Sequence, residues 1–179
     1  MAVNSYNLNR KLQQAEDRLA QKKRKELAAP GRINPLELDA IQTALGMSNT
    51  SIASAMGRST PTWRKYRCGE ITMSVEMEAK YRALARYRLS LFHRMSLPLV
   101  KLPESGEVAV VYYPKRSDFG SLPSQNPAHY EIYCQVTGLL CAVDPRVRLI
   151  AFDLDNYRHW LKGRDDSEVM RNMWAAQME

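Results

Sequence analysis

The sequence contains few of the residues that build disulfide frameworks and metal centres. Among 179 residues there are three cysteines and three histidines. Cys68, Cys134 and Cys141 form no Cys-x-x-Cys pair, and an odd number of cysteines is a poor disulfide framework. Because Cys134 and Cys141 fall seven residues apart on one face of an expected helix, we expect both to be small core residues.

Motifs of catalysis and metal binding are also missing. The three histidines stand far apart, without His-x-x-x-His or His-Glu-x-x-His spacing, and the eight glycines form no phosphate-binding loop or nucleophile elbow. Asp153 and Asp155 are a possible metal pair, but acidic residues are favoured at a helix N-terminus for electrostatic reasons alone. The sequence therefore predicts a protein that is not an enzyme and that needs no metal or other cofactor.

Long apolar segments are absent as well. No run approaches the roughly 18 to 20 apolar residues that cross a bilayer, and the first residues lack the apolar stretch of a signal peptide. We therefore expect a cytoplasmic protein without a membrane partner. Hydrophobic residues still make up 45% of the chain, which is enough for a packed core.

Positive charge is concentrated in part of the chain. The net charge is +7, of which residues 1–33 carry +5 and residues 58–94 carry +6, whereas residues 34–57 and 95–179 carry −2 each. A basic N-terminal half with a slightly acidic C-terminal half is typical of a protein whose first half contacts nucleic-acid phosphate.

The segment from residue 48 to residue 69 predicts two short helices joined by a tight turn at Gly57. Ser59 is a good N-cap for the second helix, which we expect over residues 59–68. Trp63 and Tyr66 are three residues apart, so they share the inward side of this helix and are expected to be core residues.

The outward side chains of this second helix suit the major groove of DNA. Thr60 and Thr62 fit thymine methyl groups or hydrogen bonds to base edges. Arg64 fits a bidentate contact to guanine, and Lys65 fits guanine or phosphate, although both also suit a plain charged surface. The residues expected to hold phosphate and fix the register are Arg58, Arg67, Asn49 and Thr50.

The chain predicts a mainly α protein with a small α+β part, divided into four segments. Residues 1–33 form a basic helical or partly disordered N-terminal extension, and residues 34–96 form a helix-turn-helix DNA-binding domain. Residues 107–163 form a C-terminal α+β dimerisation domain after a linker over residues 97–106, and residues 164–179 form a helical tail.

The N-terminal extension leaves three interpretations open. Leu8, Leu12, Ala15 and Leu19 make a narrow apolar stripe that gives way to a basic run at residues 22–25. The extension is a basic arm that reaches DNA phosphate, a short coiled segment against a partner, or a frayed and solvated helix.

In the DNA-binding domain, Asn34 and Glu37 form a capping box for a first helix, and a long helix is expected over residues 75–94. The dimerisation domain is expected to contain strands over residues 108–113 and 147–152 with a helix over 128–143 between them. A last helix over residues 167–177 has Val169, Met170, Met173 and Trp174 as its apolar residues.

Two strands alone make a marginal sheet, so the unit over residues 107–163 becomes stable if it pairs with a second copy. A homodimer also matches DNA recognition, because one recognition helix reads only a half-site. The competing interpretation is a ligand-sensing domain, for which no polar constellation is evident.

A set of seven residues resembles the Cro/C1-type (Xre-like) helix-turn-helix: Ile52, Ala53, Gly57, Ser59, Trp63, Tyr66 and Gly69. The order of elements that follows, including Val111-Tyr112-Tyr113 and Asn126-Pro127 before a tyrosine-rich helix, resembles the anti-CRISPR-associated regulators of phages and mobile elements and the related YdiL-like proteins. This resemblance implies a C-terminal dimerisation module and repression of the protein's own operon through inverted repeats in its promoter. The chain departs from these relatives in residues 1–33, in Tyr66-Arg67 where they often have Trp-Glu, and after Lys162.

The leading hypothesis is a homodimeric, sequence-specific repressor that binds double-stranded DNA. One alternative is an RNA-binding or dual DNA/RNA regulator, for which stacking aromatic residues are expected. Another is an antitoxin or adaptor whose C-terminal domain binds a protein partner.

Overall fold

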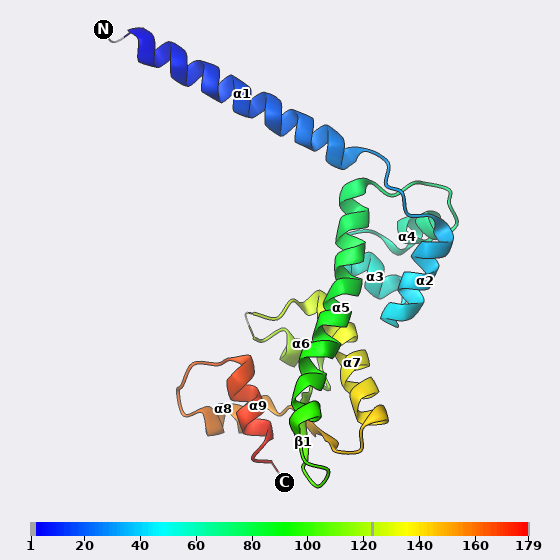
Figure 1. Ribbon diagram of the computed structural model, residues 1–179, viewed down its shortest axis with the longest axis vertical. Coiled ribbons are helices and arrows are strands. Elements are labelled where there is room, and N and C mark those ends of the chain that lie inside the picture. Colours follow the sequence, from blue (N-terminus) through cyan, green and yellow to red (C-terminus); the bar gives the residue numbers. More distant parts are fainter. Residues whose placement is uncertain (1–2, 123, 179) are drawn as a thin grey trace.

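The computed structural model describes residues 3–122 and 124–178 and shows a mainly helical chain with a small two-stranded sheet, which confirms the expected fold class. The elements, shown in Figure 1, are α1 Val3–Ala28, α2 Pro35–Leu45, α3 Asn49–Ala55, α4 Thr60–Arg67, α5 Val75–Lys101, β1 Val108–Tyr112, α6 Arg116–Phe119, the 3-10 helix η1 Pro127–His129, α7 Tyr130–Val143, β2 Val147–Ala151, α8 Leu154–Leu161 and α9 Glu168–Ala175.

Helices α2 to α5 each begin at a capping residue, and those of α2 and α4, Asn34 and Ser59, are the ones that the sequence predicts. At α2, the Asn34 side chain accepts a hydrogen bond from the Glu37 amide (2.9 Å), and the Asn34 amide donates to the Glu37 carboxylate (3.0 Å). Ser48 and Ser59 cap α3 and α4, and Ser74 caps α5. Each cap satisfies an amide that the first turn leaves free, so these boundaries are encoded locally.

Trp63 lies at the centre of the core formed by α2 to α5. Its side chain is fully buried, and its ring meets that of Tyr81 edge-on at 5.1 Å. Tyr66 is half-buried beside it, with 6.2 Å between the two ring centroids. The prediction that Trp63 is a core residue is confirmed, and α4 is held by its inner side.

Helix α5 is longer than predicted and includes the first residues of the expected linker. It continues past Pro98 to Lys101, and Leu99 in its last turn is buried. Proline is tolerated here because it removes only one hydrogen bond near the helix end. The guanidinium of Arg146 donates to the carbonyls of Leu99 (3.2 Å) and Leu102 (3.0 Å), so a side chain from a distant part of the chain helps to satisfy the carbonyls at the helix end.

Figure 1 shows α5 as one continuous helix that packs on α2 near its start and on α7 near its end. Residues 97–101 of the expected linker therefore belong to this helix. The two halves also touch directly, because the Ser51 hydroxyl in α3 donates to the Glu131 carboxylate in α7.

Strands β1 and β2 pair in parallel, from Val108 opposite Val147 to Tyr112 opposite Ala151. Parallel neighbours need a crossover connection, and α7 supplies it. The buried face of α7 carries Ile132, Tyr133, Val136, Thr137 and Leu140. Cys134 and Cys141 lie roughly a quarter turn or more from the centre of this face. Accordingly Cys134 is half-buried and Cys141 is exposed, so the prediction that both are core residues is wrong for Cys141.

Helix α9 packs against β1 and α8, so the expected tail over residues 164–179 belongs to the same packed unit as residues 107–163. Its inner face carries Arg171, Trp174 and Ala175, which are all buried. Val169 and Met173 do not belong to the core and are exposed, because the face of α9 that meets β1 is centred on Arg171 and Trp174.

Candidate nucleic-acid interface

Two short helices, α3 and α4, are joined by a tight turn at Gly57. This glycine has a φ of +63°, in the left-handed region that favours glycine, and the Arg58 amide donates to the Ala53 carbonyl (2.8 Å). The Ser59 hydroxyl then accepts from the Thr62 amide (3.3 Å) and starts α4. The turn and cap together set the direction in which α4 leaves α3.

A polar network beneath α4 fixes it to α2 and α3. The Trp63 indole N–H donates to Gln42 Oε1 (2.9 Å). Gln42 Nε2 in turn donates to Asn49 Oδ1 (2.9 Å) and to the Met47 carbonyl (3.2 Å). Arg67 donates to the same Asn49 oxygen (2.9 Å). We call Asp39, Gln42, Asn49, Trp63 and Arg67 the Gln42 network, since Arg67 also forms an ion pair with Asp39.

Sequence reasoning missed Gln42 and Asp39. Gln42 is four residues after the buried Leu38 and is itself buried. A glutamine within the inward stripe of a short helix signals a buried hydrogen-bond partner, because an unpaired buried amide is costly. That signal was present in the sequence.

The outer side of α4 carries two free cations. Arg64 and Lys65 are exposed, and among the described residues neither forms an ion pair. A hollow of about 510 Å³ lies between α2 and α4 beside Arg64, lined by Pro35, Leu36, Asp39, Arg64, Arg67 and Cys68. The cations are therefore available to a ligand.

The threonines of α4 lie in its first turn. Thr60 is half-buried, and the Thr62 hydroxyl is 2.9 Å from the Ser59 hydroxyl, so both stand at the helix start next to the turn. Arg58 is exposed in the turn itself.

The charge of Arg58 also acts on a neighbouring acid. A hydrogen bond and the charge of Lys80, with a smaller contribution from Arg58, lower the pKa of Glu76.

Of the four residues expected to hold phosphate, two are used inside the protein. Asn49 and Arg67 belong to the Gln42 network, which supports the end of α4. Thr50 is exposed in the first turn of α3, and Arg58 is exposed before α4. The structure thus brings Arg58, Thr60, Arg64 and Lys65 to one short helix and its leading turn.

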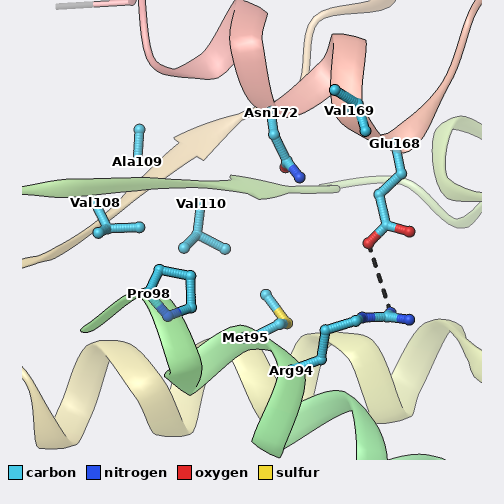
Figure 2. A pocket seen from close by; sticks show the side chains of 9 residues that line it. All are labelled: Arg94, Met95, Pro98, Val108, Ala109, Val110, Glu168, Val169 and Asn172. Atoms are coloured by element: carbon cyan, nitrogen blue, oxygen red, sulfur yellow. Dashed lines mark ion pairs between the residues drawn. The ribbon is translucent and has the colours of Figure 1, made fainter. Parts of the chain in front are cut away.

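A second hollow of about 440 Å³ lies at the open edge of β1. Figure 2 shows it between α5, which contributes Met95 and Pro98, and α9, which contributes Val169. Three consecutive residues, Val108 to Val110, line it, and β2 occupies the other edge of β1. Arg94 on α5 and Glu168 on α9 form an ion pair (3.5 Å) at its end.

Other kinds of site are not found in the described ranges 3–122 and 124–178. There, no group of three or more histidine, cysteine and acidic side chains is placed to hold a metal ion. Within the same residues, no helix has both the length and the apolar character that crossing a membrane requires.

The fold and these surfaces define a mainly helical protein that presents a basic helix after a short helix and a tight turn, followed by a small βαβ unit. The family model described as Aca2/YdiL-like matches residues 33–149, well over half of the chain, so the protein belongs to this family. Membership supports a regulatory role. A search of curated proteins found no match. Helices α1, α8 and α9 lie outside the matched range.

Proposed function

We propose that the protein is a sequence-specific DNA-binding transcriptional regulator with a Cro/C1-type helix-turn-helix. It acts as a homodimeric repressor on an inverted repeat in a promoter, that of its own operon, and has no catalytic activity. The observation that carries the proposal is the pair of free, exposed cations, Arg64 and Lys65, on a helix whose inner side is fixed by the Gln42 network.

In this proposal α4 enters the major groove, which is wide enough for one helix. Arg64 makes the bidentate contact to guanine, and Thr60 and Thr62 lie near the first base pairs. Arg58 and Thr50 hold phosphate on either side. The alternative of RNA binding is less well supported, because Trp63 is buried and Tyr66 is half-buried, which leaves no stacking platform on this surface.

A second copy of the chain is proposed at the open edge of β1. The Val108 amide donates to the Arg146 carbonyl (2.9 Å) and the Tyr112 carbonyl accepts from the Phe152 amide (2.7 Å), so these residues face β2. Because edge direction alternates along a strand, Ala109 directs its N–H and C=O to the open edge. Two Ala109 residues related by a twofold axis can exchange both hydrogen bonds in an antiparallel pair.

The surroundings of Ala109 suit such pairing. The hollow beside it is lined by Met95, Pro98, Val108 and Val169, and the same stretch of α5 exposes Leu97 and Val100. Pairing through β1 would turn a marginal two-stranded sheet into a four-stranded one and cover these apolar side chains.

Gel shifts with the DNA upstream of the protein's own gene test recognition. We expect Arg64→Ala to cost about 1–3 kcal/mol of binding for each half-site of the preferred duplex, roughly a 5- to 150-fold loss per half-site, with little change on a scrambled duplex. The control Arg158→Ala removes an exposed arginine of α8 and should bind as the wild type does. Equal binding to every duplex, which simply disappears as salt rises, would contradict specific recognition.

Sedimentation at micromolar concentration tests the dimer. Ala109→Pro removes the N–H that faces the open edge, in a position where an edge strand tolerates proline, so we expect a folded monomer. Ala109→Val keeps the N–H and should remain a dimer. A dimeric Ala109→Pro protein would show that the second copy binds elsewhere.

A further inference from the structure

Helix α1 carries a concentrated basic segment that the proposed contacts of α4 do not use. Residues 18–25, RLAQKKRK, contain five cations and no acid. All eight residues are exposed, and none of the cations forms an ion pair with any described residue. A single lysine in the last turn would be enough to complement the helix dipole, so four cations in succession exceed what the helix itself needs.

The base of α1 is fixed to the segment that follows α4. The Gly31 amide donates to the Met73 carbonyl (2.6 Å), and the Val75 amide donates to the Ala29 carbonyl (2.9 Å). The amides of Arg32 and Ile33 both donate to the carboxylate of Glu78 (2.6 and 3.1 Å). The exit of α1 is therefore set by several backbone groups within a few residues.

Gly31 allows the two segments to approach this closely. A Cβ atom at this position would lie 2.6 Å from a Glu78 carboxylate oxygen and 2.9 Å from the Met73 carbonyl oxygen. Beside it, Pro30 and Ser74 form an isolated antiparallel bridge. The base of α1 is thus fixed to the domain that carries α4. Figure 1 shows α1, the N-terminal arm, projecting from that end of the molecule, away from β1 and α9.

The character of α1 favours a phosphate backbone over a protein surface. Four consecutive cations, spaced about 100° apart, surround the helix and leave no apolar face at residues 22–25. The exposed large apolar residues further out, Leu12 and Leu19, form only a narrow stripe. Residues 18–25 lie within about 15 Å of the helix base, at 1.5 Å per residue, so they stay close to the domain that carries α4.

We propose that residues 18–25 of α1 bind the backbone phosphates of the duplex that flanks the half-site read by α4. This inference rests on the proposed DNA-binding function. Contacts of this kind add affinity and fix orientation without reading sequence, and each phosphate neutralised releases counterions. The arm lengthens the footprint of each protomer on DNA beyond what residues 33–149 would cover.

The test compares duplexes of two lengths taken from the DNA upstream of the protein's own gene. One ends at the outer edge of the protected half-sites, and the other continues by about one helical turn on each side. The wild type should bind the longer duplex more tightly. Changing all four of Lys22, Lys23, Arg24 and Lys25 to Gln should remove this gain. It should also lower the slope of log affinity against log salt by about 0.9 for each phosphate no longer neutralised, at most about 3.6 for each protomer and about 7.2 for the dimer.

The matched control is the double variant Leu12→Gln and Leu19→Gln, which changes the same helix without changing charge and should keep the gain. Equal wild-type affinity for both duplexes, or an unchanged salt slope in the Gln variant, would contradict phosphate binding by residues 18–25. Either result would leave recognition by α4 intact. Loss of dimer mass in the leucine variant would instead identify a second copy as the partner of α1 and also contradict phosphate binding by residues 18–25.

Failure of the proposed function gives a different result. The upstream duplex would then be bound no better than a scrambled duplex of the same length, whatever the flank. On the scrambled duplexes the arm is still tested by the salt slope. A protein that binds no duplex at low salt would overturn both proposals.

Discussion

Two buried polar networks hold the molecule, one in each half, and they differ in what they connect. The Gln42 network is centred on a neutral amide and ends at Arg67 and Asp39, beside the exposed Arg64. The other network is centred on the charged side chain of Arg171, which is 1% exposed. The first network connects the packed core of α2 to α4 with the candidate DNA surface. The second lies in the C-terminal half and connects helices and loops there.

The Arg171 network joins α9 to Tyr113, which follows β1, to α6 and to the segment before α9. The guanidinium makes two hydrogen bonds to Asp166 (2.6 and 3.0 Å) and also donates to Ser121 (2.9 Å) and to the Asp118 carbonyl (3.1 Å). Burial opposes ionisation of Asp166, but hydrogen bonds from Arg171 and Tyr157 keep its pKa below the ordinary value. The Arg171 guanidinium also lies over the Phe152 ring, 4.6 Å from its centroid, so its contacts tie several structural elements together.

The largest loss of stability is expected at Arg171. We expect Arg171→Met to lower the free energy of unfolding by about 3 kcal/mol, near the lower end for a broken buried pair because the Asp166 carboxylate stays partly exposed. Denaturant unfolding measures the loss. Arg158→Met, at an exposed position of α8, is the control and should be nearly neutral. At a temperature where the variant is folded, its affinity for DNA should equal that of the wild type, and a selective loss of affinity would contradict the division between the networks.

A substitution at Gln42 should differ from one at Arg171, because the Gln42 network is expected to affect both stability and DNA binding. Gln42→Met keeps the approximate volume but leaves the buried Trp63 N–H without its acceptor, at a cost of about 1–3 kcal/mol in the free energy of unfolding. Because α4 would no longer be held by this hydrogen bond, the variant should also bind the upstream duplex more weakly, even under conditions where it is fully folded. Thr43→Ala changes the exposed neighbour in α2 and is the control. A variant that is destabilised yet binds as tightly as the wild type would separate the network from the site.

The sequence predicted what is encoded locally. The capping box at Asn34, the cap at Ser59, the turn at Gly57 and the burial of Trp63 all follow from neighbouring residues, and all are confirmed. The fold class followed from the same local signals. On the candidate site, the sequence identified the outward cations of α4, which the structure places on its exposed side.

Features that depend on distant contacts were not predictable in this way. Helix α5 continues past Pro98 to Lys101, and its end contacts Arg146, more than forty positions along the chain. Arg171 was not expected in the core, since an arginine is buried only where partners from other elements satisfy it. Asn49 and Arg67 were assigned to phosphate, but their side chains meet inside the protein.

The smallest effect is expected where the two halves meet, at His129. Its ring stacks on Tyr87 of α5 (3.8 Å between centroids), and burial lowers the pKa of His129 from its ordinary value of 6.5. The unfolded chain therefore binds a proton at a higher pH than the folded protein does, so stability should fall as pH drops through and below 6.5. His129→Phe keeps the stacked ring but cannot titrate. We therefore expect the variant to lose less stability than the wild type when the pH falls from 7.5 to 5.5. The difference between the two proteins should be smaller than the losses of stability at Arg171 and Gln42. Urea unfolding at several pH values measures this, with His159→Phe as the exposed control. Identical pH profiles for the wild type and His129→Phe would show that protonation at this junction does not influence how the two halves are held together.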